Sequence, residues 1–584
     1  MTPVVIPSPG GDCFAMYAPA FGPAILMCPP FGDEALKTAR VWRDLTVRLG
    51  KQGLASLRFD LPGTGNSAGE PTDPNRVEVW RDAVRVCATW LAPRHDGRVI
   101  LFGHRFGALL ALDAAASGVK AERLVLLDPP ETGAALARYF RARARLERVG
   151  PLPEGPDYIQ AGGVPLSEAS LRAIAALPAP LGRVQFPPAL LVLNEPSSSP
   201  SSWPDRLRAR GSIVETIPFD GHADFVLHDI FRSKPPLAVL DRVTEYLVQA
   251  AGPLPPSTRL TRPLASNLSL PGFTETPIQF GPGHQMFGIL CRPDFPIGRP
   301  ALLLPTTGAD PCSGMSRMWT ELARRLAREG VTSLRFDMCG VGESGGTLSA
   351  GLSAARIAAM YSAERVADVR AAVDILGTLG FDAVRVVGYC AGAYAAWHAA
   401  VPETRIAGIL AGNLLYLNQQ SSATDEDLVQ RPGASQIGRQ AGTIIRFLPA
   451  GSIATLRWLD DSTRAIVPRR ARLWLRRWAS GPRQTRRHVT ALVSRGCSVS
   501  LVMSHDDHGH IRLRQAFGEE PRLPQGVELF VIPDADHQFS DRRHRARFLD
   551  LAASFALQKS PRLPGNHVSA TPVPSNPARV LETA

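Results

Sequence analysis

Several signatures of common protein classes are missing from this 584-residue sequence. Its eight cysteines are scattered and form no C-x-x-C pair, which argues against a zinc site or a disulfide framework and favours a reducing compartment. No apolar run reaches transmembrane length, and the start, MTPVVIPSPGGD, lacks the basic residues and apolar core of a signal peptide. We therefore expect a cytoplasmic protein with no metal and no cofactor.

The sequence also contains none of the patterns of a nucleic-acid binder, although its formal net charge is +12 and most of its basic residues are arginine. It has no zinc-finger, helix-turn-helix or RNA-binding signature, so we expect no nucleic-acid partner. The positive charge indicates either anionic partners or a bias in genome composition. A hydrophobic fraction of 45% and a charged fraction of 20% are typical of a globular protein.

A duplicated unit is the main feature that is present. Residues 55–69, ASLRFDLPGTGNSAG, match residues 332–346, TSLRFDMCGVGESGG, and the apolar block 23–34 matches 300–311. A glycine-flanked turn with an Ala-rich run, and later a strand ending near a histidine, follow in each half. Because the matches occur in the same order, they predict two domains of one architecture.

The duplication also gives domain boundaries. We expect a domain over 1–250, a linker rich in Pro and Ser over 251–269, a second domain over 270–558 and a disordered tail over 559–584. Short apolar runs alternate with helical patterns in each half, which predicts an α/β fold with a mostly parallel sheet and helices on both faces. An insertion over 414–487 is expected to form a lid.

The most informative stretch is residues 384–400, VRVVGYCAGAYAAWHAA. A β-branched run, a turn flanked by Gly388 and Gly392, and an Ala-rich run predict the strand, sharp turn and helix of a nucleophile elbow. Its centre is Cys390, and a thiol is a stronger nucleophile than a hydroxyl when a base ionises it. The alternative is a buried structural cysteine, which is common in proteins.

These blocks resemble two α/β-hydrolase domains in tandem, over most of the chain. The wording CPPFGDEALKTARVW in the first half, and LRFDMCGVGESGG with GYCAGAYAA in the second, is most similar to the hydrolases associated with the exosortase A system. Those belong to a serine-aminopeptidase-like clan and occur in bacterial exopolysaccharide gene clusters. One type carries cysteine in its elbow, as this sequence does. In this fold the chain order is nucleophile, acid, histidine.

The resemblance implies two partners downstream of Cys390. By the family's G-x-x-D spacing the acid is Asp507, with Ser504 in the glycine position and Asp506 as the alternative acid. His537 follows the last expected strand and is the base that takes the thiol proton. A Cys-His-Asp triad in the second half is therefore the expected site.

Backbone donors complete the expected site. The N–H of Ala391, together with one from Thr306 or Thr307 in the PTTG loop, would form the oxyanion hole. Asp534 and Asp536 are further carboxylates close to the expected base in sequence. The histidine-rich turn at 505–510 has no second ligand cluster, so we expect no metal there.

Two formal G-x-S-x-G matches occur outside the expected elbow, at 65–69 and 342–346. Both follow the motif LRFD, and neither is followed by an Ala-rich helix. Because the strand-turn-helix context is absent, we expect Ser344 to close a turn and not to act as a nucleophile.

The first half looks like a degenerate copy of this site. Arg105 occupies the nucleophile position, and arginine stays protonated and cannot attack a carbonyl. Glu195 is a poor match to the acid, whereas His222 remains at the place of the base. Arg105 would either hold a carboxylate or phosphate or simply fill an inactive pocket.

Three functions remain open on these residues. The first is an ester or thioester hydrolase, and the second is an acyltransferase with the same Cys390 thioester. The elbow is similar to dienelactone hydrolase, which hydrolyses, and to polyhydroxyalkanoate synthases, which transfer. The third is a non-catalytic scaffold of a polysaccharide assembly. The expected partner is a small-molecule or glycan-linked acyl substrate. The end of the expected lid, residues 469–487, is rich in Arg and Trp. It would contact that substrate, contact a membrane surface, or form only a solvated helix.

Overall fold

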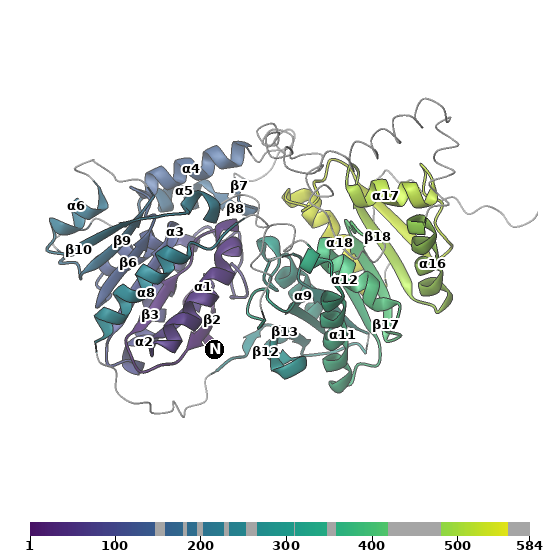
Figure 1. Ribbon diagram of the computed structural model, residues 1–584, viewed down its shortest axis with the longest axis horizontal. Helices are drawn as coiled ribbons and strands as arrows, with labels where there is room; N and C mark the ends of the chain where they lie inside the picture. Colours follow the sequence, from purple (N-terminus) through teal and green to yellow (C-terminus); the bar gives the residue numbers. More distant parts are fainter. Residues whose placement is uncertain are drawn as a thin grey trace, which may run out of the picture.

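The structure is a computed structural model (Figure 1). It describes residues 1–146, 158–178, 181, 184–194, 202–226, 233–252, 265–298, 300–308, 310–346, 358–417 and 480–558. Most of the lid expected over 414–487, the tail over 559–584 and most of the linker over 251–269 lie outside these residues. The account below concerns the described parts of the two halves.

The first half is built on an eight-stranded sheet in the order β1-β2-β4-β3-β5-β6-β9-β10. Strands β1 and β2 pair antiparallel, β2 is antiparallel to β4, and all later pairings are parallel. The strands are β1 (Thr2–Ile6), β2 (Cys13–Ala18), β3 (Ala24–Cys28), β4 (Ala55–Phe59), β5 (Val99–His104), β6 (Arg123–Leu127), β9 (Ala189–Leu193) and β10 (Val214–Pro218). A separate hairpin joins β7 (Tyr158–Ala161) and β8 (Val164–Ser167).

The second half repeats this order with one additional antiparallel strand, as β11-β12-β13-β15-β14-β16-β17-β18-β19. From β15 onward every pairing is parallel. The strands are β11 (Leu268–Leu270), β12 (Phe273–Phe280), β13 (Met286–Pro293), β14 (Ala301–Pro305), β15 (Ser333–Asp337), β16 (Val384–Tyr389), β17 (Ile406–Gly412), β18 (Ser498–Ser504) and β19 (Val527–Ile532). The two sheets lie side by side in Figure 1.

Helices cover both faces of each sheet. The helices of the first half are α1 (Asp33–Lys51), α2 (Arg76–Leu91), α3 (Phe106–Ala116), α4 (Gly133–Leu146), α5 (Glu168–Ala175), α6 (Trp203–Arg208), α7 (His222–Phe225) and α8 (Leu237–Ala251). Those of the second half are α9 (Met318–Arg328), α11 (Ala363–Thr378), α12 (Cys390–Ala400), α16 (Ser480–Ser494), α17 (His508–Phe517) and α18 (Arg542–Leu557). Short 3₁₀ turns occur at Ala92–Arg94, Pro282–His284 and Met315–Arg317.

Strand β3 shows why the apolar runs are continuous. Leu26 and Cys28 pack into one apolar core with helices α2 and α3, whereas Ile25 and Met27 pack into another with α1 and α8. Neighbouring side chains of a strand point to opposite faces, so a strand covered on both faces needs an apolar residue at every position. The predicted fold class, two tandem α/β domains with mostly parallel sheets, is confirmed.

The halves meet through equivalent loops, as in a pseudo-twofold interface. Arg58 on β4 makes two 2.7 Å hydrogen bonds to the carboxylate of Glu343. Its counterpart Arg335 on β15 contacts the side-chain oxygen of Asn66, at 3.3 Å. Arg58 aligns with Arg335, and Asn66 aligns with Glu343. The two contacts therefore join equivalent positions of the two halves, and they differ in that one acceptor is Glu and the other is Asn.

A buried polar network and an apolar patch complete this interface. Glu275 accepts hydrogen bonds from Arg324 and Arg335, and Arg324 also donates to the carbonyl oxygens of Asn66 and Ser67 in the first half. The apolar patch consists of Phe14 and Met16 from β2 with Phe287, Ile289 and Cys312 from the second half. Breaking such a buried pair by removing one partner is strongly destabilising, because the other charge is left buried and unpaired.

Candidate active site

Cys390 lies at a sharp, strained turn between β16 and α12. Its φ is +53°, a left-handed conformation that non-glycine residues seldom adopt outside functional sites. A Cβ on Gly388 would lie 2.7 Å from Gly392, and a Cβ on Gly392 would lie 2.8 Å from the Thr306 carbonyl oxygen. Both glycines are therefore required by close backbone approach, which is the local geometry of a nucleophile elbow.

Asp507 and His537 are brought together from two loops at the ends of neighbouring strands. Asp507 Oδ2 is 2.5 Å from His537 Nδ1. The other oxygen, Oδ1, accepts a 2.8 Å hydrogen bond from the backbone N–H of Gly509 and so caps helix α17. The cap fixes the carboxylate, and the carboxylate fixes the imidazole with Nε2 as the ring nitrogen left to exchange a proton.

The charges around His537 favour the protonated imidazole. Burial lowers the pKa of His537, but the charges of Cys390 and Asp507 outweigh burial and raise the pKa to about 10. An imidazolium beside a sulfur atom stabilises the thiolate form of that sulfur. The net rise in the pKa of His537 therefore comes from the other two expected residues.

Tyr361 is a contact of Cys390 that the sequence did not indicate. Its hydroxyl lies 3.4 Å from Cys390 Sγ, and the side chain is buried. Tyr361 packs edge-on against Tyr416 and Tyr394, with ring centroids 4.6 and 5.3 Å apart. Tyr394 belongs to the elbow helix α12, whereas Tyr361 and Tyr416 come from separate parts of the chain, so no local motif could have joined these two to the elbow.

One of the three expected oxyanion donors already uses its backbone N–H in another hydrogen bond, and two remain candidates. The backbone N–H of Thr306 donates to the Phe336 carbonyl oxygen at 3.2 Å, so Thr306 is not available, contrary to expectation. Ala391 is the second residue of α12, where helical N–H groups have no intrahelical acceptor. Thr307 follows Thr306, and its hydroxyl donates to Asp310 at 3.1 Å. Ala391 and Thr307 remain the candidates.

The alternative carboxylates do not contact the imidazole. The side chain of Asp506 is 79% exposed and lies 3.9 Å from His505 Nε2. Asp536 accepts a hydrogen bond from the Ser540 backbone N–H instead. Of the four carboxylates expected near the base, all within the described residues, Asp507 is the one that forms a hydrogen bond with His537.

Asn413 connects the loops that carry Asp507 and His537, and sequence reasoning missed it. Its side-chain nitrogen donates to Ser504 Oγ at 2.9 Å and to the His537 carbonyl oxygen at 2.8 Å. Its side-chain oxygen accepts from the Ser504 backbone N–H at 2.7 Å. The residue is fully buried, with φ of +43°, just after β17. It therefore positions the two loops that carry the acid and the base.

The first half has the same turn, with an arginine that is paired with two carboxylates in place of the cysteine. Arg105 has φ of +50°, the elbow conformation, and its guanidinium pairs with Asp128 at 2.7 Å and with Glu34 at 2.9 Å. His222 Nε2 also contacts Asp128, at 3.1 Å. These contacts support the second expectation for Arg105, a side chain that fills an inactive pocket, because its charge is already matched within the chain.

Asp128, which follows β6, is a carboxylate that contacts His222, whereas the expected Glu195 lies outside the described residues. Burial raises the pKa of Asp128, but His222 and Arg105 outweigh it and lower the pKa to about 2. Asp128 and Asn413 occupy equivalent positions, just after the strand that follows each elbow, and both have φ of +43°.

The serines of the two formal G-x-S-x-G loops close turns. Ser344 Oγ donates to the Asp337 carbonyl oxygen at 2.6 Å and accepts from the Phe287 N–H at 2.9 Å. Ser67 Oγ makes the same pair of contacts with the Asp60 carbonyl oxygen and the Phe14 N–H. Both hydroxyls are fully buried and saturated.

The described residues contain no group of three or more His, Cys, Asp or Glu side chains arranged to hold a metal ion. Nor does any helix among them have the length and apolar character needed to cross a membrane.

The sequence matches the model of the "Alpha/beta hydrolase family" twice, over residues 25–285 and 301–551. The chain belongs to the alpha/beta hydrolase family. The two matches contain the elbows of both halves, so this α/β hydrolase is a tandem member of its family. A comparison with curated proteins gave no match at a significant level.

Solved structures similar to this α/β hydrolase each correspond to one half of it. DcsB in complex with its substrate analogue is 18% identical, with a TM-score of 0.31, over 43% of this chain and 99% of that one. Est1E from Butyrivibrio proteoclasticus with bound ferulic acid is 21% identical, with a TM-score of 0.30, over 42% and 98%. Mouse alpha/beta hydrolase domain-containing protein 10 is 18% identical, with a TM-score of 0.30, over 43% and 99%.

Proposed function

We propose that the second half of this α/β hydrolase cleaves an ester or thioester through Cys390, His537 and Asp507, and that the first half is non-catalytic. The observation that carries the proposal is the Asp507–His537 hydrogen bond beside a cysteine held in the strained elbow conformation. Arg105 in place of the nucleophile, paired with Glu34 and Asp128, supports a first half without activity.

The proposed reaction has two steps. The Cys390 thiolate attacks the acyl carbon, a C–S bond forms, and the bond to the leaving alcohol or thiol breaks as His537 gives that group a proton. Water then attacks the thioester, His537 takes the proton from water, and the acid product leaves with Cys390 again a thiolate. The N–H groups of Ala391 and Thr307 are the proposed donors to the oxyanion of both steps.

Transfer to an acceptor hydroxyl is the second candidate. Cys390 is 6% exposed, and Tyr361, which contacts its sulfur, packs against Tyr394 and Tyr416. Such burial favours a site with little water. The wording of the sequence blocks, similar to exosortase-associated hydrolases, extends the proposal to an acyl group on a glycan of an exopolysaccharide. Incubating the protein with an acyl thioester and a glycan acceptor, and measuring free acid against acylated glycan, separates the two reactions.

The first test is the rate of Cys390 alkylation by iodoacetamide, read for each cysteine by mass spectrometry from pH 6 to pH 10. Because the pKa of His537 is raised to about 10, the imidazolium persists below that pH and should keep Cys390 as a thiolate throughout the neutral range. We expect a rate that is nearly flat from pH 7 to pH 9. An ordinary thiol, with a pKa of about 8.5, gains roughly tenfold per pH unit below that value.

The matched variant is His537→Ala, in which Cys390 should lose its selectivity and follow the rising profile of an ordinary thiol. Buried Cys497, whose pKa burial raises, is the internal reference within the same digest. A wild-type Cys390 that reacts no faster than Cys497 at pH 7 would exclude the proposed nucleophile, and a binding scaffold would become the leading function.

A further inference from the structure

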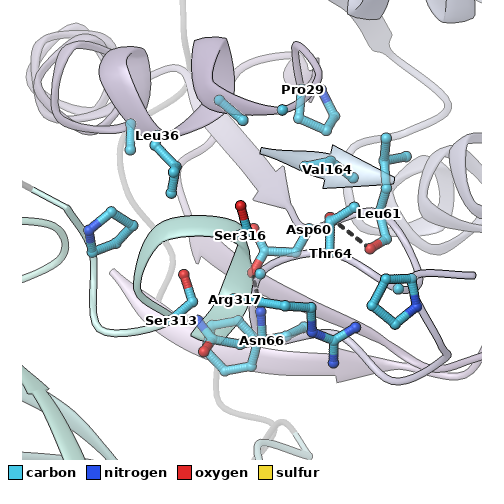
Figure 2. Close-up of a pocket in the computed structure, with 18 of the residues that line it drawn as sticks. Pro29, Leu36, Asp60, Leu61, Thr64, Asn66, Val164, Ser313, Ser316 and Arg317 are labelled. Atoms are coloured by element: carbon cyan, nitrogen blue, oxygen red, sulfur yellow. Dashed lines mark hydrogen bonds between the residues drawn. The ribbon is translucent and has the colours of Figure 1, made fainter. Parts of the chain in front are cut away.

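A cavity of about 490 Å³ lies between the two halves, and residues of both halves line it. Figure 2 shows Pro29 and Leu36 on one side of it and Ser313, Arg317 and Asn66 on the opposite side. Neither Cys390 nor His537 is among the lining residues, so this cavity is separate from the elbow site. Its volume falls within the roughly 300–1,000 Å³ of small-molecule sites, which occur preferentially between domains.

One wall of the cavity is apolar. Phe31 and Leu61 are buried residues of the first half, and Leu36 and Ala39 face it from helix α1. Leu322 on α9 closes the wall from the second half. Covering apolar surface of this kind with the apolar part of a ligand removes it from water, which favours binding.

Arginines gather at the junction of α9 and α18. Arg317 donates only to backbone carbonyl oxygens, those of Gly69 at 3.0 Å and Ser67 at 3.1 Å. Arg545 likewise donates to the carbonyl oxygens of Phe539, Ser540 and Gly163. Arg542 lines the same cavity. In the part of the chain that the structure describes, no carboxylate lies within ion-pair distance of these three guanidinium groups, and burial lowers the pKa of Arg317 to about 10.

The acidic residues of the lining have partners elsewhere. Glu343 pairs with Arg58, and Asp60 accepts the Asn66 N–H. Asp337 accepts N–H groups from Cys312 and Glu343, and burial raises its pKa to about 8, so it carries little negative charge at neutral pH. The charges of Glu321, Glu275 and Glu70 act on Arg317, and that of Glu321 also acts on Arg545. Burial raises the pKa of Glu321. The arginines therefore retain capacity for an external anion.

We propose that this cavity binds a small amphiphile with one anionic head, a carboxylate or a phosphate. Arg317, Arg542 and Arg545 receive the head, and the apolar body lies along Phe31, Leu36 and Leu61. Guanidinium groups suit both heads because their N–H donors match pairs of acceptor oxygens. The ligand would touch both halves, so it would also stabilise their association.

The test is isothermal titration of the full chain with dodecanoate, dodecyl phosphate and uncharged dodecanol, each below its aggregation threshold. We expect saturable binding of one anionic amphiphile per chain, at least tenfold tighter than dodecanol. The preferred head identifies the carboxylate or the phosphate as the native group. Arg542→Gln should weaken binding about tenfold without removing a described fold contact, whereas the control Arg543→Gln, on the same helix and paired with Asp541, should not.

Two further variants keep the outcome decisive. Leu36→Trp should fill the cavity and abolish binding while leaving the Cys390 alkylation rate unchanged, which also verifies that the variant is folded. Cys390→Ala should bind as wild type, so the result does not depend on the proposed chemistry. Absence of saturable binding, equal affinity for dodecanol, or loss in Cys390→Ala with retention in Leu36→Trp would each overturn the proposal.

Discussion

At the residue scale, the candidate site depends on a side chain that performs no chemistry. Asn413 uses three hydrogen bonds to join the end of β17 to Ser504 and to the His537 carbonyl oxygen. Ser504 in turn donates to the Asp536 carbonyl oxygen at 2.9 Å. The amide therefore sets the distance between the two loops that supply the acid and the base. We regard it as a positioning residue.

Asn413→Ala should leave Cys390 in place but loosen the Asp507–His537 pair. Unmade buried hydrogen bonds cost about 1–3 kcal/mol in stability. The specific readout is the pH profile of Cys390 alkylation, which should move toward the rising profile of an ordinary thiol. Asn194→Ala, at an exposed asparagine after β9, is the control. An unchanged profile in Asn413→Ala would mean that the residue has only a structural role.

At the element scale, the strand-turn-helix of the elbow has no spare volume. Gly392→Ala places a methyl group 2.8 Å from the Thr306 carbonyl oxygen and 3.2 Å from that of Pro305. Because both obstacles are backbone, strand β14 or helix α12 must move. We expect a loss of about 1–3 kcal/mol in unfolding free energy, measured by urea denaturation, and slower Cys390 alkylation.

Gly50 provides the matched control for this substitution. It lies in helix α1, is exposed, and an added Cβ would meet nothing within 4 Å. Gly50→Ala should therefore stabilise the protein by up to about 1 kcal/mol, because alanine favours the helix. Equal effects of Gly392→Ala and Gly50→Ala would contradict the tight elbow.

Elements were also the scale at which the sequence was most informative. The duplicated blocks predicted two similar domains, and the run around Cys390 predicted a strand, a turn and a helix, because these depend on local pattern. Asn413 and Asp128 were missed because their roles arise where distant strands end at one edge of a sheet, and Tyr361 was missed because it precedes α11, far from the elbow in sequence. Thr306 was expected as a donor, but its N–H is used by a neighbouring strand, which only the pairing register reveals.

At the scale of the whole molecule, the two halves are joined by charges that are largely withdrawn from water. The side chains of Arg58 and Glu343 are 13% and 16% exposed. Removing one member of such a pair leaves the other without its partner, which costs on the order of 3 kcal/mol. Glu343→Gln should lower the unfolding free energy by that order and separate the unfolding of the halves into two transitions in calorimetry.

The effect should depend on pH in a defined direction. Burial raises the pKa of Glu343, but Arg58 outweighs burial and the pKa in the folded protein is lowered. The contribution is therefore present above the unfolded pKa, about 4.3, and is lost as pH falls through the folded value. Asp241→Asn, in the exposed pair with Arg48, is the control and should cost no more than about 1 kcal/mol. Equal losses of unfolding free energy in Glu343→Gln and Asp241→Asn would contradict the role of the Arg58–Glu343 pair in joining the two halves.

The two equivalent interface contacts differ in one partner: Arg58 meets a carboxylate, Glu343, whereas Arg335 meets an amide, Asn66. This difference bears on how such a chain diversified. If the halves descend from one self-pairing ancestor, both contacts began identical, and only one now has a carboxylate, Glu343. Two copies of the present first half would face Arg58 with Asn66, a neutral amide, at both places. A homodimer of the first half would therefore lack this Arg–carboxylate ion pair, which forms only with the second half. Fusion of the two halves in one polypeptide supplies them at a fixed one-to-one ratio.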